Sequence, residues 1–184
     1  MTDDDAKFHL LTGGPGSGKT TLIDRLAAQG YRQLPEAGRG IIQAQMAIDG
    51  PALPWRDRAL FAEMMLAWEM RSHAAARGLS GPVLFDRGVP DVIGYLRLEG
   101  LPVPEHVMRA ARQFRYANPV FIAPPWPEIY RQDGERRQDA VTAQRTYEAM
   151  INAYRDVGYD LVALPRVGLD ERAAFLRQRI GPPA

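Results

Sequence analysis

The sequence contains no cysteine among its 184 residues, which excludes disulfides and cysteine-based metal sites. Histidine is scarce as well: the three histidines are far apart, without metal-ligand spacing, and His9 is expected to be structural. No apolar run approaches the roughly 18 residues that would span a bilayer. The acidic start, Met1–Asp5, lacks the basic-then-apolar order of a secretory signal. We therefore expect a cytoplasmic protein with no membrane partner.

Neither sign of charge is in excess. The 23 basic and 22 acidic side chains leave a formal net charge of +1. This balance argues against nonspecific nucleic-acid binding as the main task, so no nucleic-acid partner is expected. No internal repeat, low-complexity tract or long linker divides the chain, and its length suits one domain with a sizeable core. The sequence therefore predicts a single domain over residues 1–184.

The most informative feature that is present is a complete G-x-x-x-x-G-K-[ST] phosphate-binding loop, followed by a second threonine. Its residues are Gly13, Gly14, Pro15, Gly16, Ser17, Gly18, Lys19, Thr20 and Thr21. A short apolar stretch with strand character precedes the loop, and a helical pattern with Leu22, Ile23 and Leu26 on one face follows it. Strand, glycine loop and helix is the order that the motif requires. The alternative is a flexible turn between two core elements.

This loop predicts the ligands, which are ATP and Mg²⁺. Glycines let successive backbone N–H groups point into one concavity, where they cradle phosphate oxygens. Lys19 brings a positive charge to the β- and γ-phosphates, and the Thr20 hydroxyl is the expected magnesium ligand. The helix that begins near Gly18 adds its N-terminal partial charge to the same anion site.

Four further apolar runs alternate with helical patterns along the chain, at residues 31–34, 83–85, 120–123 and 160–164. With the strand before the loop they predict an α/β domain with a five-stranded, mostly parallel sheet. A long helix is expected from about Trp55 to Arg77, with one face formed by Leu60, Met64, Ala67, Trp68 and Arg71. In such sheets ligands bind outside the carboxyl ends of the strands, so residues that directly follow strands are the site candidates.

Asp86 ends the apolar strand at residues 83–85, which matches the second nucleotide motif, whose carboxylate holds magnesium directly or through water. The alternative is an aspartate that starts a turn or caps a helix. Arg87 follows, where many ATPases have a glutamate that activates water. An arginine in this place suits the binding of an acceptor or its phosphate, because its planar fork grips oxyanions.

Glu36 follows the second strand and is a candidate base that orients or deprotonates a substrate hydroxyl. Arg39, three residues on, could bind a substrate anion. The alternative is a carboxylate at a helix start beside a solvated arginine. After the fourth strand, Arg131, Arg136 and Arg137 predict a lid, at about residues 127–140, that neutralises the transferring phosphoryl group; the alternative is a solvated loop.

One short pattern carries less weight. Residues 91–94 spell the D-x-x-G of GTPases, beginning at Asp91, but the pattern is short and no N-K-x-D motif occurs anywhere in the chain. We therefore predict no GTPase site from it.

Four segments together resemble a family of predicted P-loop ATPases that is similar to the kinase domains of nicotinamide-nucleotide enzymes and to nucleoside and nucleotide kinases. They are residues 13–21, 36–39, 85–91 and 124–126. The resemblance implies a three-layer nucleotide-kinase fold with strand order 2-3-1-4-5, a lid, and acceptor-side helices at about residues 36–80. Glu36 and the Asp86–Arg87 pair match positions of deoxynucleoside kinases, and adenine is expected near Arg166, after the last strand.

The leading hypothesis is a Mg²⁺-dependent phosphotransferase that moves the γ-phosphoryl group of ATP to a small nucleoside-like or other hydroxyl acceptor. The rival is a nucleotide-dependent switch or binding protein that hydrolyses ATP or GTP slowly. An oligomeric AAA-type motor fits badly, because the chain lacks the Asp-Glu pair. The sequence leaves the acceptor and the oligomeric state open.

Overall fold

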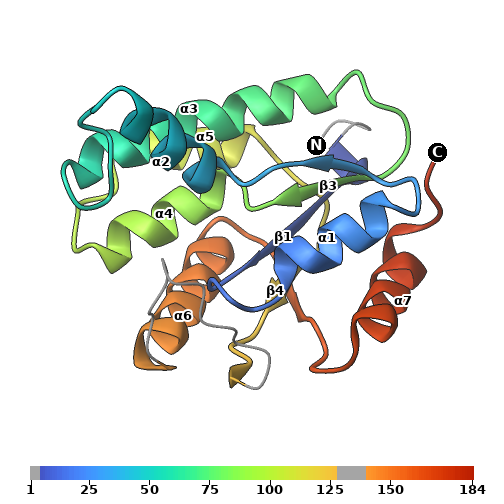
Figure 1. Ribbon diagram of the computed structural model, residues 1–184. Coiled ribbons are helices and arrows are strands. Elements are labelled where there is room, and N and C mark those ends of the chain that lie inside the picture. Colours follow the sequence, from blue (N-terminus) through green and yellow to red (C-terminus); the bar gives the residue numbers. More distant parts are fainter. Residues whose placement is uncertain (1–4, 128–139) are drawn as a thin grey trace.

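The computed structural model describes residues 5–127 and 140–184, and these form a parallel sheet with helices on both faces (Figure 1). The strand order is β2-β3-β1-β4-β5 and every pairing is parallel. The strands are β1 Phe8–Gly13, β2 Arg32–Leu34, β3 Val83–Asp86, β4 Val120–Ala123 and β5 Leu161–Ala163. The predicted fold class and strand order are confirmed.

Helices alternate with the strands along the chain, as the sequence predicts. They are α1 Lys19–Ala27, α2 Ala37–Ala47, α3 Arg58–Ala76, α4 Val89–Leu98, α5 Glu105–Gln113, α6 Ala140–Asp156 and α7 Leu169–Ile180, with a 3₁₀ turn at Asp5–Lys7. The long helix predicted from about Trp55 to Arg77 is α3, and its two ends differ slightly from the prediction. Helix α3 begins at Arg58 rather than Trp55, because the Asp57 side chain accepts a hydrogen bond from the Leu60 N–H and caps the first turn. No helix in the described ranges is both long and apolar enough to cross a membrane.

The central strands β1, β3 and β4 are almost completely buried, which explains why they appear in the sequence as short continuous apolar runs. The edge strands β2 and β5 are partly exposed. Two cores flank the sheet. Helices α1 and α7 cover one face, and α3, α4, α5 and α6 cover the other (Figure 1). The carboxyl ends of the strands remain accessible between these layers.

The face of α3 that Leu60, Met64, Ala67, Trp68 and Arg71 form is not its buried face. Leu60 is 38% exposed, and Ala67 and Arg71 are exposed as well. The buried positions are Phe61, Ala62, Leu66, Glu69, Ser72, His73 and Ala76. Helix α3 packs against α2 on one side and α4 on another, so its covered surface is wide and is offset from the apolar stripe in the sequence. This offset brings Glu69 inside.

Candidate nucleotide and acceptor site

The phosphate-binding loop joins the end of β1 to the start of α1, as the motif requires. Gly13, Gly16 and Gly18 all have positive φ, at 124°, 73° and 76°. A Cβ atom at Gly13 would lie 2.4 Å from the Ala123 carbonyl oxygen of β4, so a larger residue would clash with the sheet as well as strain the backbone. The glycine spacing of the motif therefore has a steric basis in this fold.

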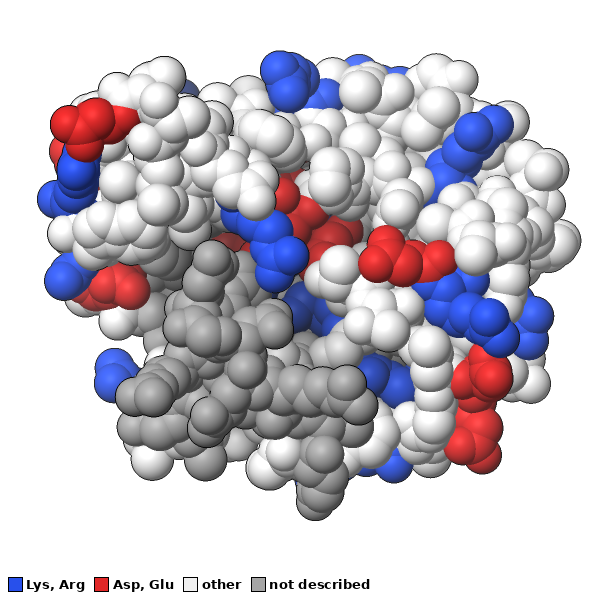
Figure 2. Space-filling view, in the orientation of Figure 1, with Lys and Arg blue, Asp and Glu red and all other residues white. Residues whose placement is uncertain are grey.

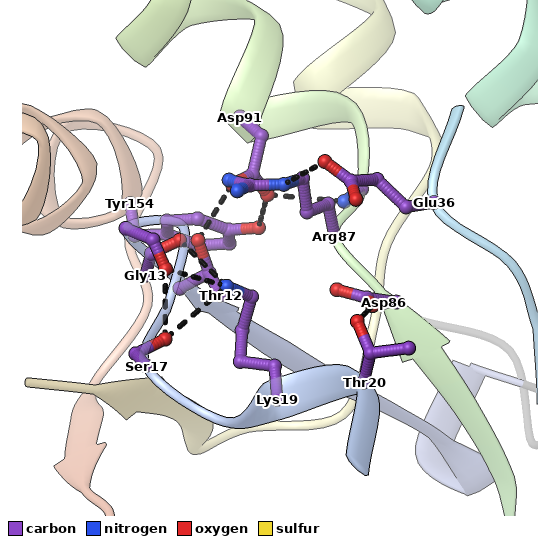
Figure 3. Close-up of polar contacts among 12 residues, drawn as sticks. Thr12, Gly13, Ser17, Lys19, Thr20, Glu36, Asp86, Arg87, Asp91 and Tyr154 are labelled. Carbon is purple, nitrogen blue, oxygen red and sulfur yellow. Dashed lines mark hydrogen bonds and ion pairs between the residues drawn. The ribbon is translucent and has the colours of Figure 1, made fainter. Parts of the chain in front are cut away.

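The Lys19 side chain forms hydrogen bonds with other residues of the same loop. Its ammonium group donates hydrogen bonds to the carbonyl oxygens of Gly13 and Gly14, at 2.9 and 2.8 Å, and to the Ser17 hydroxyl at 3.3 Å (Figure 3). The side chain is only 6% exposed. Burial, and to a smaller extent the nearby Arg87, lower the pKa of Lys19 to about 8, although acidic neighbours oppose both. Phosphate oxygens at this loop would supply the counter-charge that the buried ammonium lacks.

Thr20 and Asp86 meet at the edge of the loop, as the sequence predicts. The Thr20 hydroxyl donates to one carboxylate oxygen of Asp86 at 3.1 Å, and the second oxygen, Oδ1, is buried with no hydrogen-bond partner among the residues that the structure describes. Burial raises the pKa of Asp86, while Lys19 and Arg87 lower it. In the described ranges no group of three or more His, Cys, Asp or Glu side chains could hold a metal ion. One carboxylate and one hydroxyl, with phosphate oxygens, suit Mg²⁺.

Arg87 links the two acidic residues that lie on either side of it. Its guanidinium donates to Glu36 at 3.0 Å and to Asp91 at 3.2 Å (Figure 3). Burial lowers the pKa of Arg87, but the carboxylates of Glu36, Asp91 and Asp86 outweigh burial and raise it above its ordinary value. The backbone of Arg87 has φ 76°, a left-handed conformation that costs energy for a residue with a side chain. The fold therefore maintains a strained residue directly after β3.

Asp91 anchors this arrangement. It accepts hydrogen bonds from the Thr12 hydroxyl at 2.6 Å, from the Gly88 N–H at 3.0 Å and from the Tyr154 hydroxyl. It thereby ties together β1, the start of α4 and α6. The sequence interpretation missed Asp91 as a site residue, because it considered the D-x-x-G pattern only as a GTPase motif. The available signal was an acid three residues after Gly88, at the start of a helix, which is a capping position.

A pocket of about 410 Å³ adjoins the phosphate-binding loop and this charged group. Helices α2, α3, α4 and α6 form its walls, and Pro15 of the loop lies at its margin. Three predicted site residues line it: Glu36, Arg39 and Arg87. Figure 2 shows acidic side chains recessed near the centre of the face, with basic side chains beside them. The pocket is thus continuous with the region where the phosphates of ATP are expected.

Glu69, on α3, also lines the pocket and was missed by the sequence interpretation. Its side chain is 4% exposed, and it forms no hydrogen bond or ion pair within the described part of the chain. Burial raises its pKa well above the usual value for glutamate, and Asp91, Asp86 and Glu36 raise it further, whereas Arg87 lowers it. A glutamate within an apolar helix gives no signal of this placement.

Glu69→Gln is expected to change how stability depends on pH. The pKa of Glu69 is higher in the folded protein than in the unfolded chain, so between these values the folded state binds more protons. The stabilisation that protonated Glu69 contributes is fully present below the pKa of Glu69 in the unfolded chain. It is lost as the pH rises through the pKa of Glu69 in the folded protein. Relative to the Gln variant, the wild type should lose up to about 1.4 kcal/mol for each pH unit in that window.

Melting temperatures of both proteins between about pH 4.5 and pH 8 measure this difference. The same substitution at Glu148, an exposed residue of α6, is the control for the chemical change itself. A constant difference between wild type and Glu69→Gln across the range would contradict the raised pKa of Glu69.

The remaining predicted residues have different outcomes. Arg166 is exposed after β5 and is not among the residues that line the pocket described above. The lid arginines Arg131, Arg136 and Arg137 lie outside the described residues. A different arginine, Arg172 of α7, approaches the loop: it donates to the Ser17 carbonyl at 3.1 Å, and its guanidinium lies 5.6 Å from the Trp126 ring. The sequence interpretation missed it, since nothing marks one helical arginine among several.

The sheet order and the phosphate-binding loop define a P-loop fold of the nucleotide-kinase type. A family model described as "AAA domain" matches residues 8–172, and the chain belongs to this family. The predicted relationship to P-loop ATPases is therefore confirmed. A search of curated proteins found no significant match.

Solved structures with the same fold include NadR and two kinases. The chain is similar to the NadR protein in complex with NR, with 18% identity and a TM-score of 0.73 over 96% of this chain. It spans only 52% of that NadR chain. Deoxyadenosine kinase from M. mycoides and thymidylate kinase from Ehrlichia chaffeensis each align with 12% identity and a TM-score of 0.63, over 94% of this chain and 97% of theirs. At these identities the likeness concerns the fold.

Proposed function

We propose that this protein transfers the γ-phosphoryl group of ATP to a hydroxyl group of a small nucleoside-like acceptor. The observation that carries the proposal is the position of Arg87 with Glu36 and Asp91, between the phosphate-binding loop and the pocket. A plain hydrolase needs only to position water. A pocket beside the phosphate-binding loop, lined by a candidate base and an arginine, is what an acceptor requires.

Each residue of the site has a separate proposed role. The amides of the loop and Lys19 bind the phosphates of ATP, while Thr20 and Asp86 would hold Mg²⁺. When bound, Mg²⁺ would neutralise charge on the β- and γ-phosphates. Arg39 and Arg87 bind the acceptor. Positioning and electrostatics supply most of the catalysis in this reaction, so little covalent chemistry is required of the protein.

Glu36 is the proposed base. Its carboxylate accepts the proton of the acceptor hydroxyl as the new bond between oxygen and the γ-phosphorus forms. The bond from the γ-phosphorus to the β,γ-bridging oxygen breaks, and ADP leaves with that oxygen. Arg87, already paired with Glu36, balances the negative charge that develops on the phosphoryl group. NadR with NR and deoxyadenosine kinase share this fold, which supports an acceptor of nucleoside type.

ADP release with and without added hydroxyl compounds tests this function. Nucleosides, nucleotides and vitamins are supplied singly with MgATP, and products are examined for a transferred phosphate. We expect one chemical class to raise ADP release severalfold and to yield a phosphorylated product. If slow hydrolysis stays unchanged with every compound, the protein is better explained as a nucleotide-dependent switch.

A further inference from the structure

Glu69 is a carboxyl group of the pocket that the proposed chemistry does not use. Phe61, Met65 and Glu69 are four residues apart along α3, so all three face the pocket from one stripe of the helix. This stripe covers about 12 Å along the helix axis. Glu69 lies at one end, where its electrostatic neighbours are Asp91 and Arg87. Phe61 lies at the other end, and its ring contacts that of Tyr95 at 5.4 Å between centroids.

The contrast between Glu69 and Asp91 is informative, because both are buried acids of the same pocket. Asp91 has hydrogen-bond partners on three different elements. Glu69 has none within the described ranges, although it is equally buried. A buried carboxyl group without a partner costs stability, and an apolar residue of similar size would pack against the same core at lower cost. A buried glutamate of this kind has a use where a ligand supplies its hydrogen-bond partner.

The chemistry of that partner follows from the carboxyl group. Whether protonated or ionised, Glu69 presents at least one oxygen that can only accept a hydrogen bond. The guanidinium that lowers the pKa of Glu69, that of Arg87, is already engaged by Glu36 and Asp91. A hydrogen-bond donor on a ligand would therefore complete the surroundings of Glu69. Apolar side chains, Ile42 and Val92 among them, also line the pocket and suit contact with the apolar part of a ligand.

We propose, on the basis of the phosphotransferase function above, that Glu69 selects the acceptor by accepting a hydrogen bond from a nitrogen group. The acceptor is then a hydroxyl-bearing nitrogen heterocycle with an amino group or a positive ring charge. Tyr95 has a buried hydroxyl with no hydrogen-bond partner in the described part of the chain, and it offers a second polar contact in the pocket. Arg87 and Glu36 remain available for the reacting hydroxyl.

Matched acceptor pairs test this inference. Cytidine and adenosine carry an amino group where uridine and inosine carry an oxygen, and a pyridinium riboside supplies the ring cation. Binding is measured by thermal shift without ATP, and kcat/KM is measured with MgATP. Wild type should favour the amino or cationic member by at least about tenfold. Glu69→Met should remove this preference and raise the melting temperature of the free protein, whereas Glu148→Met should do neither.

Each result has a distinct meaning. If the nitrogen compounds bind in preference but no phosphate is transferred, the phosphotransferase function fails and the role of Glu69 stands. If transfer occurs with equal or opposite preference within the pairs, the role of Glu69 is wrong and the function stands. If no amino or cationic compound binds, or if Glu69→Met and Glu69→Gln both destabilise the free protein, the carboxyl group is structural and the inference is overturned.

Discussion

Lys19→Ala is expected to abolish nearly all of the thermal stabilisation that MgATP gives to this protein. At a hundredfold excess over the dissociation constant, a bound ligand stabilises the wild type by about 2.7 kcal/mol. Without the ammonium group, the loop loses the one side-chain cation that its motif directs at the β- and γ-phosphates. Turnover of ATP should fall with binding. Thermal melts with and without MgATP measure the effect.

The melt without nucleotide is an essential part of this experiment. Lys19 is buried and bonds to the carbonyl oxygens of Gly13 and Gly14, so its removal also loosens the free loop. The relevant quantity is therefore the shift that MgATP produces in each protein, rather than the absolute melting temperature. Lys19→Arg, which keeps the charge, should retain part of the shift. Equal shifts in wild type and Lys19→Ala would contradict the phosphate-binding role.

Glu36→Gln should lower acceptor-dependent phosphoryl transfer by roughly 10²–10⁴-fold, the usual contribution of a general base. Glutamine keeps the size of the side chain and can still accept a hydrogen bond from Arg87, but it cannot take the proton of the acceptor hydroxyl. The ion pair of Glu36 is with Arg87, on the acceptor side of the phosphate-binding loop, so affinity for ATP should stay within a few fold of wild type. Transfer is measured beside titration with a fluorescent ATP analogue.

Arg87→Ala separates the role of the base from that of the charge pair. It should chiefly raise the acceptor KM or slow transfer, because Arg87 contacts Glu36 and Asp91 rather than the loop side chains. Should both variants keep full transfer, or lose nucleotide binding outright, the assignment of the acceptor site is wrong. The switch interpretation, in which no acceptor is consumed, would then be preferred.

Local sequence was sufficient to predict the phosphate-binding loop between a strand and a helix. The phosphate-binding loop is a continuous run of residues whose glycines are needed by the backbone itself, as at Gly13, so the pattern predicts its own conformation. The buried strands could be recognised because central parallel strands are apolar on both faces. Asp86 is the last residue of β3, and the fold then brings its carboxylate to Thr20. These features depend on neighbours along the chain and on one general rule of sheet topology.

Only the tertiary structure determined which residues come together at the proposed acceptor pocket. Glu36 and Arg87 are 51 residues apart, and only the parallel pairing of β2 with β3 brings their positions together. Asp91 became an anchor because α4 and α6 pack so that Tyr154 reaches it. Glu69 lies on a helix that is apolar around much of its surface, so its direction depends on how α2 and α4 cover that helix. Helical periodicity predicts which residues share a face, but packing determines which face points into the pocket.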